Sequence, residues 1–354
     1  MKLINHSLKR HALYLLTSCV ALLFSLPLIT LHAQKSRDET DTFIRWEHSD
    51  DGLKRRFEAR GKPEFTDDYT DIKSVSVGGW VIIEEQRNGQ SMRYEVRRDP
   101  AGNLTRAFYV NGAARPLDET TRAWLAKFVL DAVRQGGLDA ENRVRTILAQ
   151  KGVAGVLAEI GQISGDYAQR IYYQYLIKQG NLNATAMRDA LRQMARDISS
   201  DYEQAQLLIA VAPMLNGKDA AIQPFFDALA TIKSDYEQGR VLKTVLKQGA
   251  PSPAFLVLSA SATKNISSDY ERRGVLTALV QTKNQSEEVL RLLLDSAAAM
   301  SSDYEKATFL IEVSNVYTGD TRLRSEFLKA VETIKSDYER GRVLSTLLKN
   351  KQIG

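Results

Sequence analysis

The sequence predicts an α+β protein in which a small antiparallel β-sheet domain is followed by an α-solenoid of helical hairpins, each about 34 residues long. Three observations lead to this prediction. Ser-Asp-Tyr-Glu occurs five times at a spacing of 34 residues, starting at Ser200, Ser234, Ser268, Ser302 and Ser336. A degenerate copy, Gly165-Asp166-Tyr167-Ala168, precedes them by 35 residues. The stretch from 43 to 117 instead alternates apolar and polar residues between Asn-Gly turns, which is typical of strands.

The predicted sheet domain covers residues 34–118. We expect strands over 53–59, 80–84, 92–97 and 104–110, and therefore a meander of four to five strands. Asn88-Gly89 and Asn111-Gly112 favour tight hairpin turns between them. Connecting helices are expected over 119–152, with one helix over 120–135 and a second over 140–151, and the repeat domain over 153–354.

Each repeat is expected to contain two antiparallel helices, A and B. Helix A ends on an apolar residue three positions before the motif aspartate, namely Ile163, Ile198, Ile232, Ile266, Met300 or Ile334. Helix B starts at the motif, and its apolar stripe lies six, seven, ten and usually eleven residues after the aspartate. Examples are Val241, Leu242, Val245 and Leu246, and Val343, Leu344, Leu347 and Leu348. One pair cannot bury both stripes, so the hairpins must stack.

Three letters of the motif are explained by helix capping. In Ser-x-x-Glu, the serine hydroxyl accepts from the glutamate N–H and the glutamate carboxylate is expected to accept from the serine N–H. The aspartate lies in the first turn, where the helix dipole favours negative charge. The residues assigned to capping are Ser200, Glu203, Ser234, Glu237, Ser268, Glu271, Ser302, Glu305, Ser336 and Glu339.

Capping does not explain the tyrosine, which lies about 150° around helix B from the centre of the apolar stripe. The tyrosines are Tyr167, Tyr202, Tyr236, Tyr270, Tyr304 and Tyr338. One interpretation is packing against the neighbouring repeat, with each hydroxyl finding a partner. The other is a row of rings that binds a peptide or glycan. Small residues three positions later, such as Ala205 and Gly239, suggest that another backbone passes close by.

Residues 1–33 are expected to be a signal peptide or an N-terminal membrane anchor. Lys2, Lys9 and Arg10 precede an apolar run over 12–31, and Ala33 offers a cleavage site. The charge distribution predicts a cytoplasmic N-terminus and a periplasmic or extracytoplasmic remainder. A lipoprotein with Cys19 as the lipidated residue is a third option, although the run stays apolar well beyond it. Membrane contact is expected only through residues 12–31, if these are retained.

Composition excludes several functions. Removing the three basic residues of this segment from the total of 48 leaves 45 against 43 acidic residues, so no nucleic-acid partner is expected. Cys19 is the only cysteine, and His48 is the only histidine after residue 33. This rules out thiol nucleophiles and multi-histidine metal centres in the rest of the chain, and we expect no metal, cofactor or catalytic residue. Asp67, Asp68 and Asp71 lack the spacing of a calcium loop, and Ser261-Ala262-Thr263-Lys264 lacks the companion elements of a Ser-x-x-Lys enzyme.

The phrase Ile-x-Ser-Asp-Tyr-Glu, followed by an apolar stripe, resembles the extracytoplasmic tails of membrane metallopeptidases of the beta-lactam-sensor (antirepressor) type and related hypothetical exported bacterial proteins. The resemblance covers roughly residues 60–354, including Phe65-Thr66-Asp67-Asp68 and the segment ending at Val110-Asn111-Gly112. It implies a sensing or docking module and carries no functional residue across, because the zinc motif of that family lies in a peptidase domain not found here. In helix length the repeats are also similar to HEAT and tetratricopeptide units.

These observations favour a non-enzymatic interaction, scaffold or sensing module that binds a protein or peptide partner through the repeat surface. An exported hydrolase that uses carboxylates, or an accessory subunit of one, is the alternative, since 43 acidic residues always offer pairs. A mechanical spacer is a third hypothesis.

Overall fold

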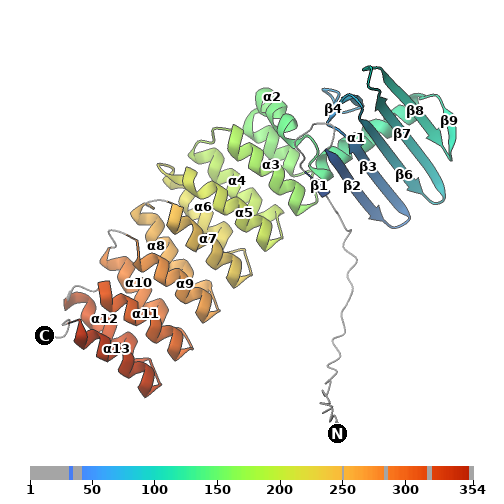
Figure 1. Ribbon diagram of the computed structural model, residues 1–354. Coiled ribbons are helices and arrows are strands. Elements are labelled where there is room, and N and C mark those ends of the chain that lie inside the picture. The colour runs from blue at the N-terminus through green and yellow to red at the C-terminus, as the bar shows by residue number, and fades with distance from the viewer. Residues whose placement is uncertain (1–31, 35–41, 249–250, 283–285, 317–320, 351–354) are drawn as a thin grey trace, which may run out of the picture. The chain divides into compact units, whose positions relative to one another are not determined.

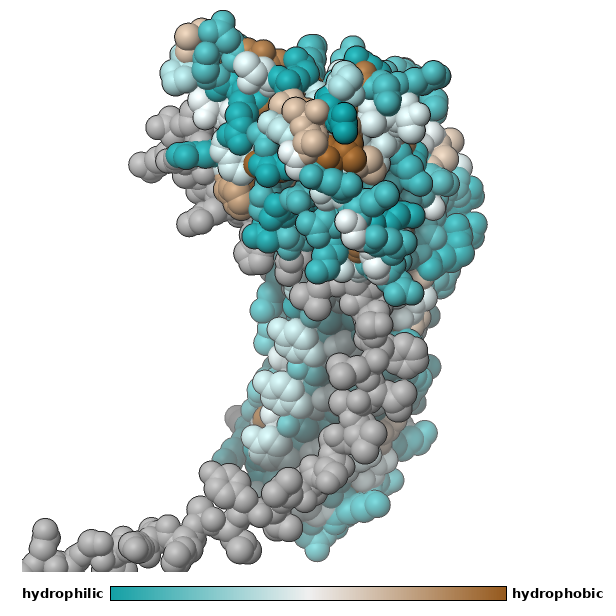
Figure 2. Space-filling model, turned by 90° about the vertical axis from the view of Figure 1, so that its right-hand side faces the viewer, coloured by the Kyte–Doolittle hydropathy of each residue, from teal (hydrophilic) through white to brown (hydrophobic). Residues whose placement is uncertain are grey.

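The computed structural model confirms the α+β class with a helical repeat region (Figure 1). It describes residues 32–34, 42–248, 251–282, 286–316 and 321–350. The chain divides into two compact units. The sheet unit contains residues up to 63 together with 75–116, and the repeat unit contains 64–74 together with the chain from 117 onward. The face of the molecule in Figure 2 is mostly hydrophilic.

The sheet unit is a seven-stranded antiparallel sheet with the order β1-β2-β3-β6-β7-β8-β9. Its strands are β1 (His32–Gln34), β2 (Phe43–Asp50), β3 (Leu53–Arg60), β6 (Trp80–Arg87), β7 (Gln90–Arg98), β8 (Leu104–Val110) and β9 (Ala113–Arg115). The expected four to five strands were too few, because β1 and β9 have only three residues each and β2 carries several charged residues. Two further short strands, β4 (Pro63–Phe65) and β5 (Ile72–Val75), pair with each other.

Tight turns set the register of this sheet. Asn88 and Gly89 both have positive φ, 50° and 83°, between β6 and β7, as a two-residue turn of the primed type requires. With that register, one row of directly opposed residues crosses five strands on one face of the sheet, and all of them are at most 3% exposed. The row is Trp46, Phe57, Ile83, Tyr94 and Phe108.

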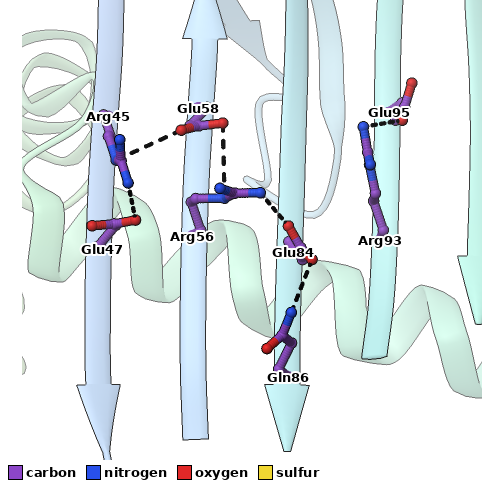
Figure 3. Close-up of polar contacts among 8 residues, drawn as sticks. All are labelled: Arg45, Glu47, Arg56, Glu58, Glu84, Gln86, Arg93 and Glu95. Carbon is purple, nitrogen blue, oxygen red and sulfur yellow. Dashed lines mark hydrogen bonds and ion pairs between the residues drawn. The ribbon is translucent and has the colours of Figure 1, made fainter. Parts of the chain in front are cut away.

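The opposite face of the sheet is charged (Figure 3). Arg45 lies 2.6 Å from Glu47 and 3.6 Å from Glu58, and Arg56 pairs with both Glu58 and Glu84. Opposite charges alternate across neighbouring strands, and each such cross-strand pair contributes a few tenths of a kcal/mol up to about 1 kcal/mol.

The repeat unit stacks helices in two layers (Figure 1). The A layer contains α2 (Ala140–Ile160), α4 (Ala184–Asp197), α6 (Asp219–Leu229), α8 (Pro253–Ala262), α10 (Glu287–Ala298) and α12 (Thr321–Glu332). The B layer contains α3 (Asp166–Gln179), α5 (Asp201–Val211), α7 (Asp235–Gln248), α9 (Asp269–Val280), α11 (Asp303–Val316) and α13 (Asp337–Lys349). α1 (Glu119–Gly136) contacts α3 and so precedes it in the B layer. The short 3-10 helices η2 (Ala212–Leu215) and η3 (Thr263–Asn265) follow α5 and α8.

The hydrophobic pattern read from the sequence holds in the core. The six apolar residues expected to end the A helices lie one to four positions beyond the helix ends, yet all are at most 3% exposed, and so are Val241 and Leu242 on α7. Leu348 is the exception, at 61% exposed, because no described helix follows α13 to cover it. The helix expected to end at residue 151 continues to Ile160 across a break at Gly152, which has a φ of 62°.

The apolar run over 12–31 lies outside the described residues, and Ala33, after which we place a cleavage site, is the middle residue of β1. Among the residues described, no helix combines the length and hydropathy needed to cross a membrane.

Candidate functional site

The six motif tyrosines form a row along the B layer, each at the second residue of its helix. Their exposed fractions run from 38% for Tyr167 to 75% for Tyr338. Among the described residues, none of the six hydroxyls has a hydrogen-bond partner. Of the two interpretations, packing against the neighbouring repeat would bury these rings and pair their hydroxyls, whereas the rings are exposed and, in the described part of the chain, only Tyr202 and Tyr304 carry an arginine of the next repeat. We call these residues the tyrosine row. Figure 2 shows pale, weakly polar side chains following one another along the stack.

Arginine guanidinium groups lie over four of the rings, at 5.0 to 5.8 Å from the ring centroid. At the first and fourth repeats the arginine belongs to the same helix as the tyrosine. At the second and fifth repeats it comes from the next helix of the B layer. The pairs are Arg170–Tyr167, Arg273–Tyr270, Arg240–Tyr202 and Arg342–Tyr304. Each contact is worth about 0.5–1 kcal/mol at an exposed site.

The motif serines start the B helices. Each serine hydroxyl accepts a hydrogen bond from the N–H of the glutamate three residues later, over 3.3 to 3.4 Å. The serines are Ser200, Ser234, Ser268, Ser302 and Ser336, paired with the N–H groups of Glu203, Glu237, Glu271, Glu305 and Glu339. Because every B helix starts at the same motif position, the tyrosines share one place on all of them.

The second half of the expected capping box is replaced by a contact between repeats. The serine N–H does not bond its own glutamate. It donates to the carboxylate of the motif aspartate in the preceding repeat, over 2.7 to 2.8 Å. The main-chain N–H of the residue before the serine donates to the same carboxylate. These aspartates are Asp166, Asp201, Asp235, Asp269 and Asp303. We call each such contact an aspartate clip.

The serine N–H bonds the aspartate and not its own glutamate because the aspartate carboxylate, in the first turn of one helix, reaches two adjacent N–H groups of the next loop. Hydrogen bonds to a charged acceptor are stronger than neutral ones. The hydrogen bonds from Ser336 and Lys335 hold the pKa of Asp303 below its usual value. Gln135 takes the equivalent place at the start of the stack, where it accepts from the N–H and hydroxyl of Ser164.

The motif glutamates are free to pair with basic side chains. Glu203 and Glu305 pair with arginines of the preceding repeat, Glu271 pairs with Lys243 over 2.7 Å, and Glu237 and Glu339 pair with arginines of their own helix. The arginines are Arg170, Arg273, Arg240 and Arg342, the same four that lie over the rings. The carboxylates beside the tyrosine row are therefore already neutralised.

At Gly239, the small residue three positions after the tyrosine makes room for a glutamate of the next repeat. A Cβ added at Gly239 would lie 2.8 Å from Oε2 of Glu271 in the next repeat, whereas one added at Gly341 would meet nothing within 4 Å. The space was expected to hold a backbone, and it holds a side chain instead.

One mostly buried column of polar side chains was not predicted from the sequence, although its spacing was visible. The residue after the motif glutamate donates to the main-chain carbonyl of the isoleucine six positions before it, in five of six repeats. The donors are Gln169, Gln204, Gln238, Arg272 and Arg340. Lys306 differs, since it donates to the carbonyl of Thr333 in the next repeat over 3.0 Å. The sequence could have indicated this column, because every copy of the repeat has a long side chain with an N–H donor at this position.

A second polar cluster lies where residues 64–74 meet the start of α2. The hydroxyl of Tyr69 donates to Asp139 over 3.0 Å, and Arg143 lies 4.7 Å over its ring. Arg143 also donates a hydrogen bond to Glu159 over 2.7 Å, and Arg134 donates two hydrogen bonds of 2.8 and 2.9 Å to the same carboxylate. Burial raises the pKa of Tyr69, and so does Asp139, so this phenol remains a donor. The cluster ties the loop to the helices.

The other residues considered from sequence have local roles. Asp68 accepts from the N–H and hydroxyl of Thr70, which lowers its pKa together with a hydrogen bond from Thr66. Asp71 accepts from the N–H of Ile72. His48 stacks on Trp46 at 6.2 Å between ring centroids.

Comparisons with protein-family models, with curated proteins and with solved structures found no match to this chain.

Proposed function

We propose that this protein is a non-enzymatic interaction module that binds a protein or peptide partner through the tyrosine row. One observation carries the proposal: six exposed tyrosines occupy the same position on six stacked helices, with no partner for any hydroxyl among the described residues. Tyrosine is enriched in protein interfaces because its rigid ring buries a large area while its hydroxyl makes specific hydrogen bonds.

The arrangement supports binding for a second reason. Guanidinium groups lie over four of the six rings and are themselves paired with glutamates, which favours a defined position for these four rings before a partner arrives. A preorganised surface loses less conformational entropy on binding.

The test compares the wild-type chain with a variant carrying Tyr236→Ala, Tyr270→Ala and Tyr304→Ala in capture from the extracytoplasmic fraction. Any captured protein is then purified and titrated directly. We expect the variant to lose binding, while its free energy of unfolding falls by only about 1–2 kcal/mol through loss of the two guanidinium contacts of Tyr270 and Tyr304. Tyr109→Ala, which removes a half-buried ring from β8 of the sheet unit, is the control outside the tyrosine row. Equal binding by wild type and the triple variant would refute the proposal.

We further propose that the chain works outside the cytoplasm, in the sensing or docking role that the resemblance to antirepressor-type tails implies. The support is the charged and apolar pattern of residues 1–33. Sequencing the N-terminus of the chain isolated from cells distinguishes a cleaved signal, which starts at Gln34, from a retained anchor. The competing hydrolase would instead turn over peptide or peptidoglycan and lose this activity on a single Asp or Glu substitution.

A further inference from the structure

The spacing of the tyrosine row restricts what can bind along it. One ring is offered per B helix, always from the same turn, and each B helix packs on the next. Packed helices lie about 8–10 Å apart. A ligand that contacts successive rings must therefore present the same chemical face once every 8–10 Å or so.

Among extended polypeptides, the polyproline II helix meets this condition. It has three residues per turn and a rise of about 3.1 Å, so every third residue faces the same side after roughly 9.3 Å. A β-strand repeats its face every two residues, at about 6.6 Å, or every four, at about 13 Å, and misses the spacing. An α-helix repeats near 10.5 Å per heptad. It needs an apolar groove, whereas charged Glu and Arg side chains lie beside each ring here.

The hydrogen-bonding groups of the row favour the same ligand. Tyrosine hydroxyls without partners can donate, and each guanidinium group over a ring has five N–H donors, of which its glutamate occupies only part. The neighbouring glutamate carboxylates are already paired, so free acceptors are few. A proline-rich chain is complementary, because its carbonyls accept, its backbone makes no internal hydrogen bonds and proline has no N–H to satisfy.

We propose that the tyrosine row binds a proline-rich segment in the polyproline II conformation, with one three-residue turn for each repeat. The proposal rests on the proposed function of the row as a binding surface. The ligand is uncharged or weakly charged, since each carboxylate beside the rings is neutralised by an arginine or lysine.

The experiment titrates the full chain into fluorescently labelled oligoproline of 15 residues and follows anisotropy. Fifteen residues span five turns and thus most of the row, whereas six residues span two. We expect the longer peptide to bind at least tenfold more tightly, because each added turn reaches another ring. A Gly-Ser peptide of 15 residues, which is flexible, should bind at least tenfold more weakly.

Variants show whether binding occurs at the row. The triple change Tyr236→Ala, Tyr270→Ala and Tyr304→Ala should weaken oligoproline binding at least tenfold, and Tyr109→Ala should leave it unchanged. The triple change to Phe keeps the rings and removes the hydroxyls, so a loss of about two- to tenfold is expected.

Several results would overturn the proposal. These are no binding of oligoproline, equal binding of the 6- and 15-residue peptides, or equal binding by wild type and the triple Ala variant. A chito-oligosaccharide that binds at the row when oligoproline does not would also overturn it and indicate a glycan ligand. If a protein partner is lost in the triple variant while oligoproline never binds, the polyproline proposal fails and the interaction function stands. If neither the protein partner nor oligoproline needs the tyrosines for binding, the polyproline proposal and the proposed interaction function both fail.

Discussion

Replacing Asp235 with alanine should destabilise the repeat unit by removing one aspartate clip. Its Oδ2 accepts from the N–H of Ser268 over 2.7 Å in a partly buried site, and its Oδ1 accepts from the exposed N–H of Ser267 over 3.1 Å. The exposed N–H can bond water after the change, so most of the cost comes from Ser268. A hydrogen bond to a charged acceptor contributes about 1.5–3 kcal/mol, and a first-turn carboxylate adds about 0.3–1 kcal/mol through the helix dipole. We expect a total loss of about 2–4 kcal/mol.

Asp337→Ala is the matched control. Asp337 holds the same motif position on α13, its side chain is 90% exposed, and it pairs with Arg340 of its own helix. This variant loses the dipole contribution and a surface ion pair, about 0.5–2 kcal/mol together. The difference between the two variants therefore isolates the clip.

Urea unfolding followed by circular dichroism measures the shift in midpoint, and hydrogen exchange locates it. Repeat arrays can lose two-state behaviour, so the exchange of the amides at 267 and 268 is the more direct measurement. We expect faster exchange there in Asp235→Ala. Equal midpoint shifts for Asp235→Ala and Asp337→Ala, with unchanged exchange at these amides, would refute the role of the clip.

Asparagine substitutions give an independent check. Asp235 uses both carboxylate oxygens, whereas Asp269 accepts from Ser301 and Ser302 with Oδ2 alone. An asparagine can replace a single acceptor, but at position 235 its NH₂ group would face an N–H donor. Asp235→Asn should therefore be the more destabilising of the two, and the reverse order would contradict this geometry.

Three further predictions concern stability. Ser234→Ala should cost about 0.5–2 kcal/mol through loss of the cap and leave partner affinity unchanged, as measured by thermal unfolding and direct titration; unchanged stability with lost binding would contradict the capping role. Burial raises the pKa of Glu159, but the two arginines that grip it outweigh this and hold the pKa below the unfolded value. Its contribution is therefore present above about pH 4.3 and lost as the pH falls through the folded pKa. Glu159→Gln should accordingly flatten the loss of stability on acidification, and an unchanged acid profile would contradict it. Gly341→Ala should stabilise by about 1 kcal/mol through helix propensity, while Gly239→Ala should gain less because its Cβ would displace a glutamate 2.8 Å away; equal gains in thermal unfolding would contradict that contact.

Much of the fold follows from local pattern. The hydrophobic period predicted the helices, and the burial of Val241, Leu242 and Ile232 agrees with it. The Asn-Gly pairs predicted the hairpins because only a few residue types adopt two successive positive φ angles. β1 and β9 escaped prediction, since three residues are too few to show alternation.

The candidate site was predicted only in part. The sequence separated Tyr236 from the apolar stripe of its helix, but it left open whether the ring would be covered by the neighbouring repeat or exposed. That outcome depends on the side chains of the adjacent repeat, such as Glu271 over Gly239. The same holds for the buried donors at Gln204 and Arg272, whose partners are carbonyls in loops.

By itself, the sequence determined the repeat period, the residue at which each B helix starts and the stripe that it buries, because these depend on contacts within about one helical turn. Only the tertiary structure decided the partners of Asp235, Glu271 and Tyr236. The aspartate and glutamate contacts join residues 33 and 28 positions apart, and the geometry of stacked helices, not local preference, determines which atoms meet. The aspartate bonds the next repeat, the glutamate neutralises a basic side chain, and the tyrosine is left exposed to solvent.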